Sequence, residues 1–365
     1  MKKILIGICG IGNGHMNRQR LIIDNLLQYD VDIVLAITQK DYDLFDSLYP
    51  TIKKVLIHAP WIIYNDVGID FESTKTKYLQ SGIDYFGSFL DFSISVQKAF
   101  NGNNPDFVMT DYERNVAQFA YATGRPLVCL DQHSKFLTLS TETINNFSAD
   151  VGNSMLLYFF PKAEKRYVSS FFKIEDDKKF NIETIPPVLK NIQKGQVNSN
   201  KAVVYFSPYT SEVCSYSKIL ELIKNYKNYE FNIYTYLEFP DYYKYDNLIF
   251  KKIGDQFNND LSDCSFIVSS SGHQLIVEAI NLEIPLYIFP LDTYDQNYCC
   301  HFVEKHGLGK KINTCETQEF NNFIENLDLY RENMKKHKSI HYKDKWDKIL
   351  FEKLERAFGI ERKHS

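Results

Sequence analysis

Residues 1–38, MKKILIGICGIGNGHMNRQRLIIDNLLQYDVDIVLAIT, decide the fold class of this chain. The apolar run 3–10 ends in a glycine-rich turn, residues 17–30 carry apolar side chains at helical spacing, and residues 31–38 form a second apolar run. A strand, a helix and another strand in this order build a parallel sheet. A tight glycine turn before the helix also leaves the helix amino end free to face a phosphate.

The same order recurs in two halves of the chain. Apolar runs at 106–111 and 126–133 flank a helical stretch in the first half, and the pattern restarts at residue 202. The proline-containing polar stretch between them is typical of a linker. We therefore expect an α/β protein with two Rossmann-like domains and a cleft between them. The expected segments are a first domain at 1–185, a linker at 186–200, a second domain at 201–340, and a C-terminal helix within 341–365 that packs back towards the first domain.

Composition excludes several classes of partner. A length of 365 residues suffices for two cores. A net charge of -4 with interspersed lysines gives no broad basic surface, so nucleic acid is not an expected partner. Seven scattered cysteines without a C-x-x-C pair indicate reduced thiols. No apolar run approaches the roughly 20 residues of a membrane-spanning helix, and the first residues lack a signal-peptide cleavage site. We expect a cytoplasmic protein with at most peripheral contact at the inner face of the membrane.

Polar residues follow several of the expected strands, where ligands of open α/β sheets bind. Thr110 and Asp111 end one strand, and Asp131 and His133 follow another. The first glycine loop departs from the dinucleotide fingerprint, because His15 occupies the place of its third glycine. No acidic residue stands squarely at the end of the strand 31–38. Both features disfavour a nicotinamide-dependent dehydrogenase.

A second loop, FIVSSSGHQLIVEAINLEIPLYIFPLDTYDQN at 266–297, carries the strongest functional signal. Small residues end a buried strand, and a helix starts directly after Gly272, so free amides and the helix dipole can hold a phosphate or diphosphate. Glu278 lies under two turns into this helix, where a carboxylate reaches a ribose next to that phosphate. Asp295 and Gln296 offer hydrogen bonds to a polyhydroxylated ligand from the same sheet edge.

These motifs resemble a known group of enzymes. SSSGHQLIVEA, IPLYIFP and DQN are similar to the donor-binding signature of GT-B glycosyltransferases, which include the UDP-glycosyltransferases and the enzyme that adds GlcNAc to lipid-linked muropeptide. GIGNGH resembles their amino-terminal glycine loop, and residues 110–133 resemble a bacterial and archaeal branch with Asp-x-Glu and Asp-x-His patterns. Many plant members have a phosphate-binding His where this chain has Ser270, and an Asn-Ser pair where it has Gln274 and Leu275.

The resemblance implies an inverting, metal-independent hexosyltransferase that moves a sugar from a nucleotide-diphosphate donor, with UDP expected, to a hydroxyl of a bacterial surface glycan or glycolipid. His15 would be the general base, a task that suits a His with a pKa near neutrality. Asp111 or Asp131 would orient its ring, and Glu113 completes the catalytic candidates. No Asp-x-Asp pair ends a strand, so a divalent metal is not required. The nucleotide-diphosphate sugar is the co-substrate, and no cofactor is expected. The candidate donor-binding residues are Gly12, Gly14, Ile253, Phe257, Ser269, Ser270, Ser271, Gly272, His273, Glu278, Asp295 and Gln296.

Several alternatives stay open from the sequence. His15 also suits a structural histidine, His273 a plain helix-start residue, and Asp111 and Glu113 suit helix caps. A non-hydrolysing sugar-nucleotide epimerase and an inactive nucleotide-sugar-binding regulator both fit the same architecture. The aromatic segment 60–100 is either a helical excursion packed on the sheet or a provider of acceptor-binding loops. Basic residues at 162–166 could face anionic lipid or water.

Overall fold

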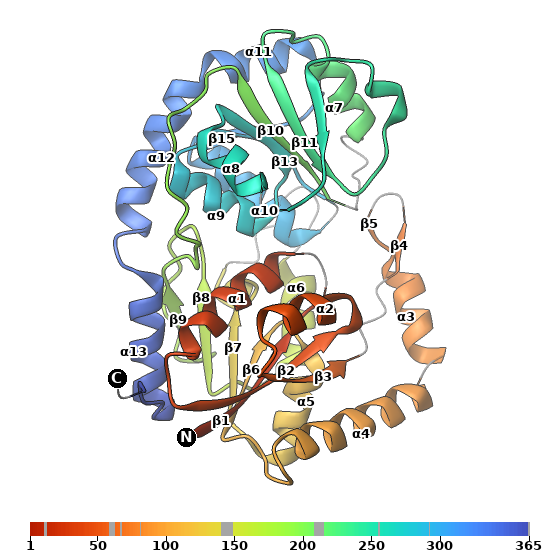
Figure 1. The fold of residues 1–365 in the computed structure, drawn as a ribbon, viewed down its shortest axis with the longest axis vertical. Helices are drawn as coiled ribbons and strands as arrows, with labels where there is room; N and C mark the ends of the chain where they lie inside the picture. Colours follow the sequence, from red (N-terminus) through yellow and green to blue (C-terminus); the bar gives the residue numbers. More distant parts are fainter. Residues whose placement is uncertain are drawn as a thin grey trace.

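The computed structural model describes the whole chain except residues 11–12, 58–62, 66–67, 81, 140–148, 208–214, 255, 292 and 364–365. Two α/β domains lie one above the other, with the N-terminal domain below in Figure 1. Each domain is built on a wholly parallel sheet, as the alternation of apolar runs and helical stretches predicts.

The N-terminal sheet has seven strands in the order β3-β2-β1-β6-β7-β8-β9. Its strands are β1 (Lys2–Ile8), β2 (Val31–Thr38), β3 (Lys53–Ile57), β6 (Phe107–Asp111), β7 (Leu127–Asp131), β8 (Lys165–Ser169) and β9 (Ile182–Ile185). The helices of this part are α1 (Gly14–Leu26), α2 (Gln39–Leu48), α3 (Phe71–Gln80), α4 (Gly82–Ala99), α5 (Arg114–Thr123) and α6 (Ala149–Phe159), with a short 3-10 turn η1 (Ser134–Leu137). Strand order reverses between β1 and β6, which is where ligands bind in such sheets.

The C-terminal sheet has six strands in the order β12-β11-β10-β13-β14-β15. These are β10 (Lys201–Phe206), β11 (Glu230–Thr235), β12 (Leu248–Lys251), β13 (Phe266–Ser270), β14 (Leu286–Phe289) and β15 (Gly309–Lys311). The helical elements here are α7 (Tyr216–Ile223), η2 (Pro240–Tyr242), α8 (Gln256–Asp263), α9 (His273–Leu282), α10 (Tyr294–Lys305), α11 (Thr317–Glu325), α12 (Leu327–His341) and α13 (Trp346–Phe358). No helix or strand lies between Ile185 and Lys201.

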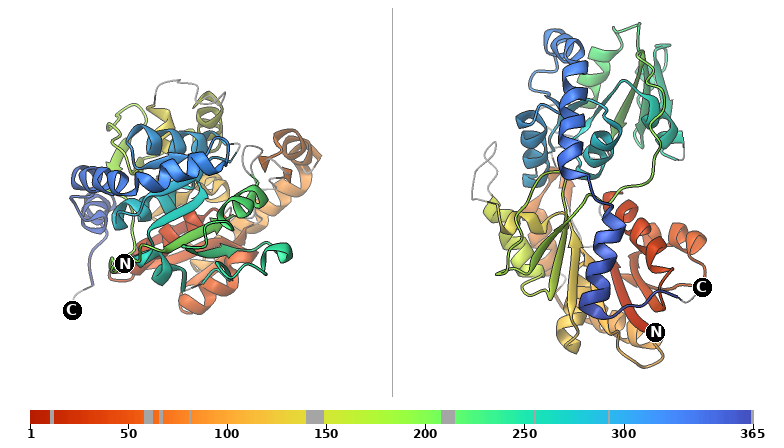
Figure 2. Two further views of the ribbon diagram at one scale, coloured as in Figure 1. Left: turned by 90° about the horizontal axis from the view of Figure 1, so that it is seen from above. Right: turned by 90° about the vertical axis from the view of Figure 1, so that its left-hand side faces the viewer.

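Helix α13 returns to the N-terminal domain. Figures 1 and 2 show α12 and α13, in blue, running along one side of both domains. Leu350, Phe351 and Leu354 are buried in the same apolar cluster as Ile22 of α1. The Phe351 ring stacks on Tyr29 at 5.1 Å between centroids.

The two domains also share apolar contacts of their own. Phe172, which follows β8, stacks on Phe302 of α10 at 4.0 Å, and Phe136 of η1 meets Tyr294 of α10 edge to face at 4.8 Å. Burial of such aromatic pairs stabilises one relative placement of the domains. The polar cleft described below therefore lies beside a packed apolar junction.

Close backbone approach explains two glycines of the first strand and turn. A Cβ on Gly7 would lie 2.3 Å from Val116 Cγ2, so α5 packs directly onto β1. A Cβ on Gly10 would lie 2.4 Å from Thr38 Cγ2, which brings the first loop against the end of β2. The second approach places the loop before α1 at the carboxyl edge of the sheet.

Segment 60–100 is mainly helical where it is described. A two-stranded antiparallel pair, β4 (Tyr64–Asn65) and β5 (Gly68–Ile69), precedes α3 and α4. Figure 1 shows α4 below the sheet on the side of β3, and Phe92 and Val96 bury their side chains. The helical excursion is therefore present, and the expected acceptor-binding role of its loops stays a prediction.

The basic residues at 162–166 have different surroundings. Lys165 pairs with Glu183 at 2.5 Å, and Arg166 is buried with its guanidinium on the carbonyl of Phe160. Only Lys162 is exposed. Within the described ranges, no helix has both the length and the apolar character needed to cross a membrane.

Candidate active site

A cavity of about 510 Å³ lies between the two domains. Residues of α1 and of the turn after β7 line one wall, and residues of α9, of the segment from β12 to α8 and of the start of α10 line the other. The predicted residues that line it are Gly14, His15, Ile253, Phe257, Ser270, Gly272, His273, Glu278, Asp295 and Gln296. Residues from both halves of the chain therefore converge on one pocket, although Gly12 lies outside the described residues.

The amino ends of α1 and α9 both point into this cavity. The first amides of any helix have no hydrogen-bond partner within the helix. In α1 and α9 the N-cap side chain does not bind them either. The helices approach so closely that a Cβ on Gly14 would lie 3.7 Å from the Cβ of Gln274. Two helix dipoles thus place positive partial charge on the cavity, which suits an anionic ligand.

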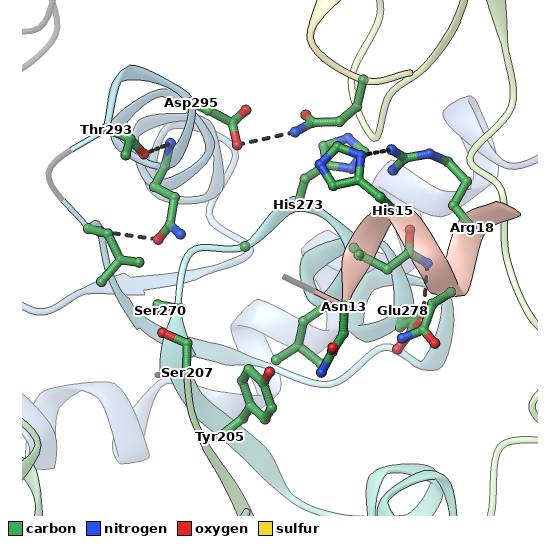
Figure 3. A pocket seen from close by; sticks show the side chains of 18 of the residues that line it. Asn13, His15, Arg18, Tyr205, Ser207, Ser270, His273, Glu278, Thr293 and Asp295 are labelled. Atoms are coloured by element: carbon green, nitrogen blue, oxygen red, sulfur yellow. Dashed lines mark hydrogen bonds between the residues drawn. The ribbon is translucent and has the colours of Figure 1, made fainter. Parts of the chain in front are cut away.

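His15 and Asp111 form a hydrogen-bonded pair at the α1 wall. The distance between His15 Nδ1 and Asp111 Oδ1 is 2.8 Å, and the Asp111 side chain is fully buried. A proton on Nδ1 is donated to Asp111, which leaves the lone pair of Nε2 for an incoming hydroxyl. Figure 3 shows the His15 ring at the cavity, beside Arg18 of the same helix.

Asp111 is held by three further donors. Arg18 contributes Nη2 at 2.6 Å and Nε at 3.0 Å, and Gln19 Nε2 donates at 3.0 Å. Burial alone would raise the pKa of Asp111, but the charge of Arg18 and the hydrogen bonds from His15 and Arg18 outweigh it and hold that pKa well below its ordinary value. Asp111 is therefore an anchored carboxylate anion.

His133 stacks on the ring of His15. Its ring is nearly parallel to that of His15, at 9° and 5.7 Å between centroids. Gln132 Nε2 lies 3.2 Å from His133 Nε2, which assigns the proton of a neutral His133 to Nδ1. Burial lowers the pKa of His133 to about 4, so the ring is neutral near pH 7.

Asp295 connects the two domains across the cavity. Gln132 Nε2 donates to it at 3.2 Å, and the fully buried Lys135 reaches it at 3.3 Å. Burial opposes ionisation of Asp295, but the charge of Lys135 and the hydrogen bond from Gln132 hold its pKa well below the ordinary value. This carboxylate, predicted to bind a donor sugar, is therefore charged and fixed from the opposite domain.

Glu278 and Gln296 complete the α9 and α10 wall. Gln274 Nε2 donates to Glu278 Oε1 at 3.1 Å, and burial raises the pKa of Glu278 above its ordinary value. Gln296 Oε1 accepts from the Leu291 amide at 3.1 Å, so this side chain also shapes the loop before α10.

The far end of the cavity is aromatic. Tyr205, Tyr236, Ile253 and Phe257 line it, and the Tyr205 and Phe257 rings meet at 5.9 Å between centroids. Asn13 Nδ2 donates to the Tyr236 hydroxyl at 3.2 Å across the domains. Flat apolar surfaces of this kind suit a nucleobase.

Besides Asp111, which contacts His15 from the buried side, three predicted residues do not line the cavity. Glu113 caps α5: its Oε2 accepts from the Val116 amide at 2.9 Å, and its Oε1 accepts from Asn115. The expectation of a catalytic Glu113 is therefore corrected in favour of the helix-cap alternative. Ser269 and Ser271 donate their hydroxyls to the carbonyls of Ser270 and Gln296.

The two candidates for orienting His15 differ clearly in the structure. Asp131 accepts from the amide and the hydroxyl of Ser134 at 2.7 and 3.0 Å, which caps η1. Asp111 instead contacts His15 itself. Asp111 is thus the orienting partner.

Sequence reasoning missed three residues that shape the site, Arg18, Gln132 and Lys135, whereas it placed His133 among the strand-end residues expected at the cleft. Arg18 lies one helical turn after His15, which was an available signal, whereas Lys135 meets Asp295 only through the tertiary fold. Within the described part of the chain, no group of three or more His, Cys, Asp or Glu side chains is arranged to hold a metal ion.

Residues 2–328 match the model of Glycosyl transferase family 1. The chain belongs to this family. It is accordingly a glycosyltransferase. A search of curated proteins found no matching sequence.

Solved structures of glycosyltransferases share the fold of this family member. CalG4, the calicheamicin glycosyltransferase, is 13% identical with a TM-score of 0.68, over 98% of this chain and 98% of its own. Phytolacca americana UGT2, solved with UDP-2fluoro-glucose and pterostilbene, is 13% identical with a TM-score of 0.70, over 97% and 98%. A Polygonum tinctorium UDP-glucosyltransferase capable of glucosylating indoxyl is also 13% identical, with a TM-score of 0.71 over 98% of both chains. The protein has the GT-B fold.

Proposed function

We propose that this glycosyltransferase moves a sugar from a UDP-sugar to a hydroxyl acceptor with inversion and without a metal ion. The observation that carries the proposal is the pair of His15 and Asp111, facing the uncapped amino end of α9 across one cavity. The bound UDP-2fluoro-glucose of the Phytolacca protein supports the class of donor. Synthesis of a bacterial surface glycan or glycolipid at the cytoplasmic face of the membrane is the proposed setting.

The donor binds on the C-terminal wall. First-turn amides of α9 and Gly272 hold the diphosphate, and Glu278 accepts from the ribose hydroxyls. The base lies against Ile253 and Phe257, and the sugar extends towards Asp295. Asp295 is already ionised, so it accepts strongly from sugar hydroxyls.

The acceptor enters from the N-terminal wall. His15 Nε2 removes the acceptor proton while the acceptor oxygen bonds to the anomeric carbon. The bond from that carbon to the phosphate oxygen breaks, and its electron pair stays on the diphosphate. Attack opposite to the leaving group inverts the configuration, and the positive ends of α1 and α9 stabilise the departing charge.

The epimerase alternative has less support from the cavity. Such an enzyme needs several carboxylates around the sugar carbons. Among the described residues that line the cavity, the carboxylates are Glu278 and Asp295, and Asp295 is bound to Lys135. We therefore do not propose epimerisation.

Calorimetric titration with UDP, dTDP, CMP and NAD tests the donor class first. We expect UDP to bind selectively, and His15→Ala to bind UDP as the wild type does. With UDP-glucose and a panel of hydroxyl acceptors, the wild type should release UDP and form a glycoside. The NMR signal of its anomeric proton should show that the configuration of the anomeric carbon is inverted relative to the donor. His15→Ala should lose this transfer, which also excludes the inactive regulator. Binding of NAD alone, or retention of the anomeric configuration, would overturn the proposal.

A further inference from the structure

His273, the first residue of α9, is buried without a hydrogen-bond partner. It is 4% exposed, it lines the cavity, and both of its ring nitrogens lack a partner among the described residues. Buried polar atoms are almost always paired, because an unpaired one costs about 1–3 kcal/mol. An apolar residue at this position would avoid that cost. Packing alone therefore does not explain why an imidazole is present here.

Titratable side chains from several elements lie around this ring. Lys135 of η1, Asp295 of α10, Arg18 of α1 and His133 after β7 all act on it electrostatically. The Phe171 ring lies against it at 5.4 Å between centroids. Burial lowers the pKa of His273 well below its ordinary value, so the empty site holds a neutral imidazole with one N–H and one lone pair unused.

Other side chains of the same loop are already engaged. The Ser269 and Ser271 hydroxyls donate to backbone carbonyls, and the Ser271 amide donates to the Phe289 carbonyl. Ser270 stands where a phosphate-binding His occurs in many plant members of the resembling family, and it cannot carry a charge. His273 is thus the titratable side chain that this helix end presents to the cavity (Figure 3).

We propose that His273 binds the donor diphosphate and takes up a proton from solvent as the diphosphate docks. This inference rests on the proposed function and adds a residue to it. The resulting imidazolium donates a hydrogen bond to a phosphate oxygen. When the bond from the anomeric carbon to the phosphate oxygen breaks, the electron pair stays on that oxygen and the imidazolium offsets the added negative charge. Because binding and protonation are linked, UDP binds more tightly as the pH falls towards 6.

Two substitutions separate this role from packing. His273→Phe keeps an aromatic ring and removes both unpaired nitrogens, so we expect equal or higher thermal stability with UDP affinity about tenfold to hundredfold weaker at pH 6.5. His273→Gln keeps hydrogen bonding without titration and should bind UDP more weakly at pH 6.5 but nearly as the wild type at pH 8.5. His301→Gln, an exposed change on α10, is the matched control.

Calorimetry of UDP binding in two buffers of different ionisation enthalpy measures the proton directly. The wild type and His301→Gln should take up a proton that both His273 variants do not, and the comparison cancels ionisation of UDP itself. Equal proton uptake and equal affinity in the variants would overturn the inference while leaving the proposed function intact. If the wild type binds no UDP, both the inference about His273 and the proposed function are overturned. Only that outcome would contradict the assignment of the donor site.

Discussion

The two walls of the candidate active site hold their cavity-lining histidines in different ways. At the α1 wall, Asp111 receives His15, Arg18 and Gln19, so the candidate base is fixed before any substrate arrives. At the α9 wall, both ring nitrogens of His273 have no partner among the described residues, and the N-cap residue of α9 makes no side-chain cap. The difference indicates that one wall is preorganised for chemistry and the other is completed by its ligand.

Replacing Asp111 should break the preorganised wall with the largest effect. Asp111→Asn keeps the shape but removes the charge that His15 and Arg18 share, so we expect kcat to fall about 10³–10⁴-fold. Buried Arg18 also loses its counter-ion, which should lower the free energy of unfolding by about 3 kcal/mol or more. Transfer kinetics and urea unfolding measure the two effects.

Asp131→Asn is the matched control for this change. Asp131 ends the neighbouring strand but caps η1 rather than contacting His15. We expect a stability loss of about 1 kcal/mol and a kcat within a few fold of wild type. Similar kcat values for Asp111→Asn and Asp131→Asn would show that the His15 contact has no catalytic role.

Removing Lys135 tests the connection between the walls. Lys135→Met leaves the partly buried Asp295 without its cation, so the free energy of unfolding should fall by about 2 kcal/mol. Lys348→Met, which removes an exposed lysine of α13, should change it by less than about 0.5 kcal/mol. Equal unfolding midpoints in urea for the two variants would refute a stabilising interdomain pair.

The pH dependence of stability should be set in part by two buried imidazoles, those of His133 and His337. Burial lowers the pKa of His133 and of His337 to about 4, whereas an unfolded His titrates near 6.5. The unfolded state binds more protons in this range, so stability is full above pH 6.5 and falls as the pH drops towards 4. Each of the two groups should lower the free energy of unfolding at pH 5 by about 2 kcal/mol relative to pH 7.

Urea unfolding of wild type and His337→Gln at both pH values measures this slope. His337 contacts the carbonyl of Phe171 rather than the cavity, and glutamine keeps a donor there without titrating. The variant should lose about half of the pH dependence assigned to the two groups. An unchanged slope would assign the acid sensitivity to other residues.

The smallest effect concerns the wall that the ligand completes. Glu278→Gln keeps the contact with Gln274 but weakens charge-assisted hydrogen bonds to ribose, so UDP affinity should fall about tenfold. Glu283→Gln, at the other end of α9 and paired with Lys194, is the control and should bind UDP unchanged. Calorimetry that finds both variants equal to wild type would remove Glu278 from the donor site.

Local pattern was enough to predict much of this site. Glycine loops before α1 and α9 place His15 and Gly272 at helix amino ends, and such ends of parallel units meet at one sheet edge. Glu113 was misassigned because a carboxylate just before a helix suits a cap and a catalyst equally well. Only its contact with the Val116 amide separates the two roles.

What the sequence by itself determined is the α/β class and the candidate residues of each loop, because side-chain periodicity and turn chemistry act over a few residues. The tertiary structure decided which candidates meet. Asp111 rather than Asp131 reaches His15 because β6 pairs directly with β1, whereas β7 lies one strand further away. Lys135 and Asp295 are 160 positions apart and pair only because the domains pack face to face. Such contacts depend on strand order and domain packing, which no local pattern encodes.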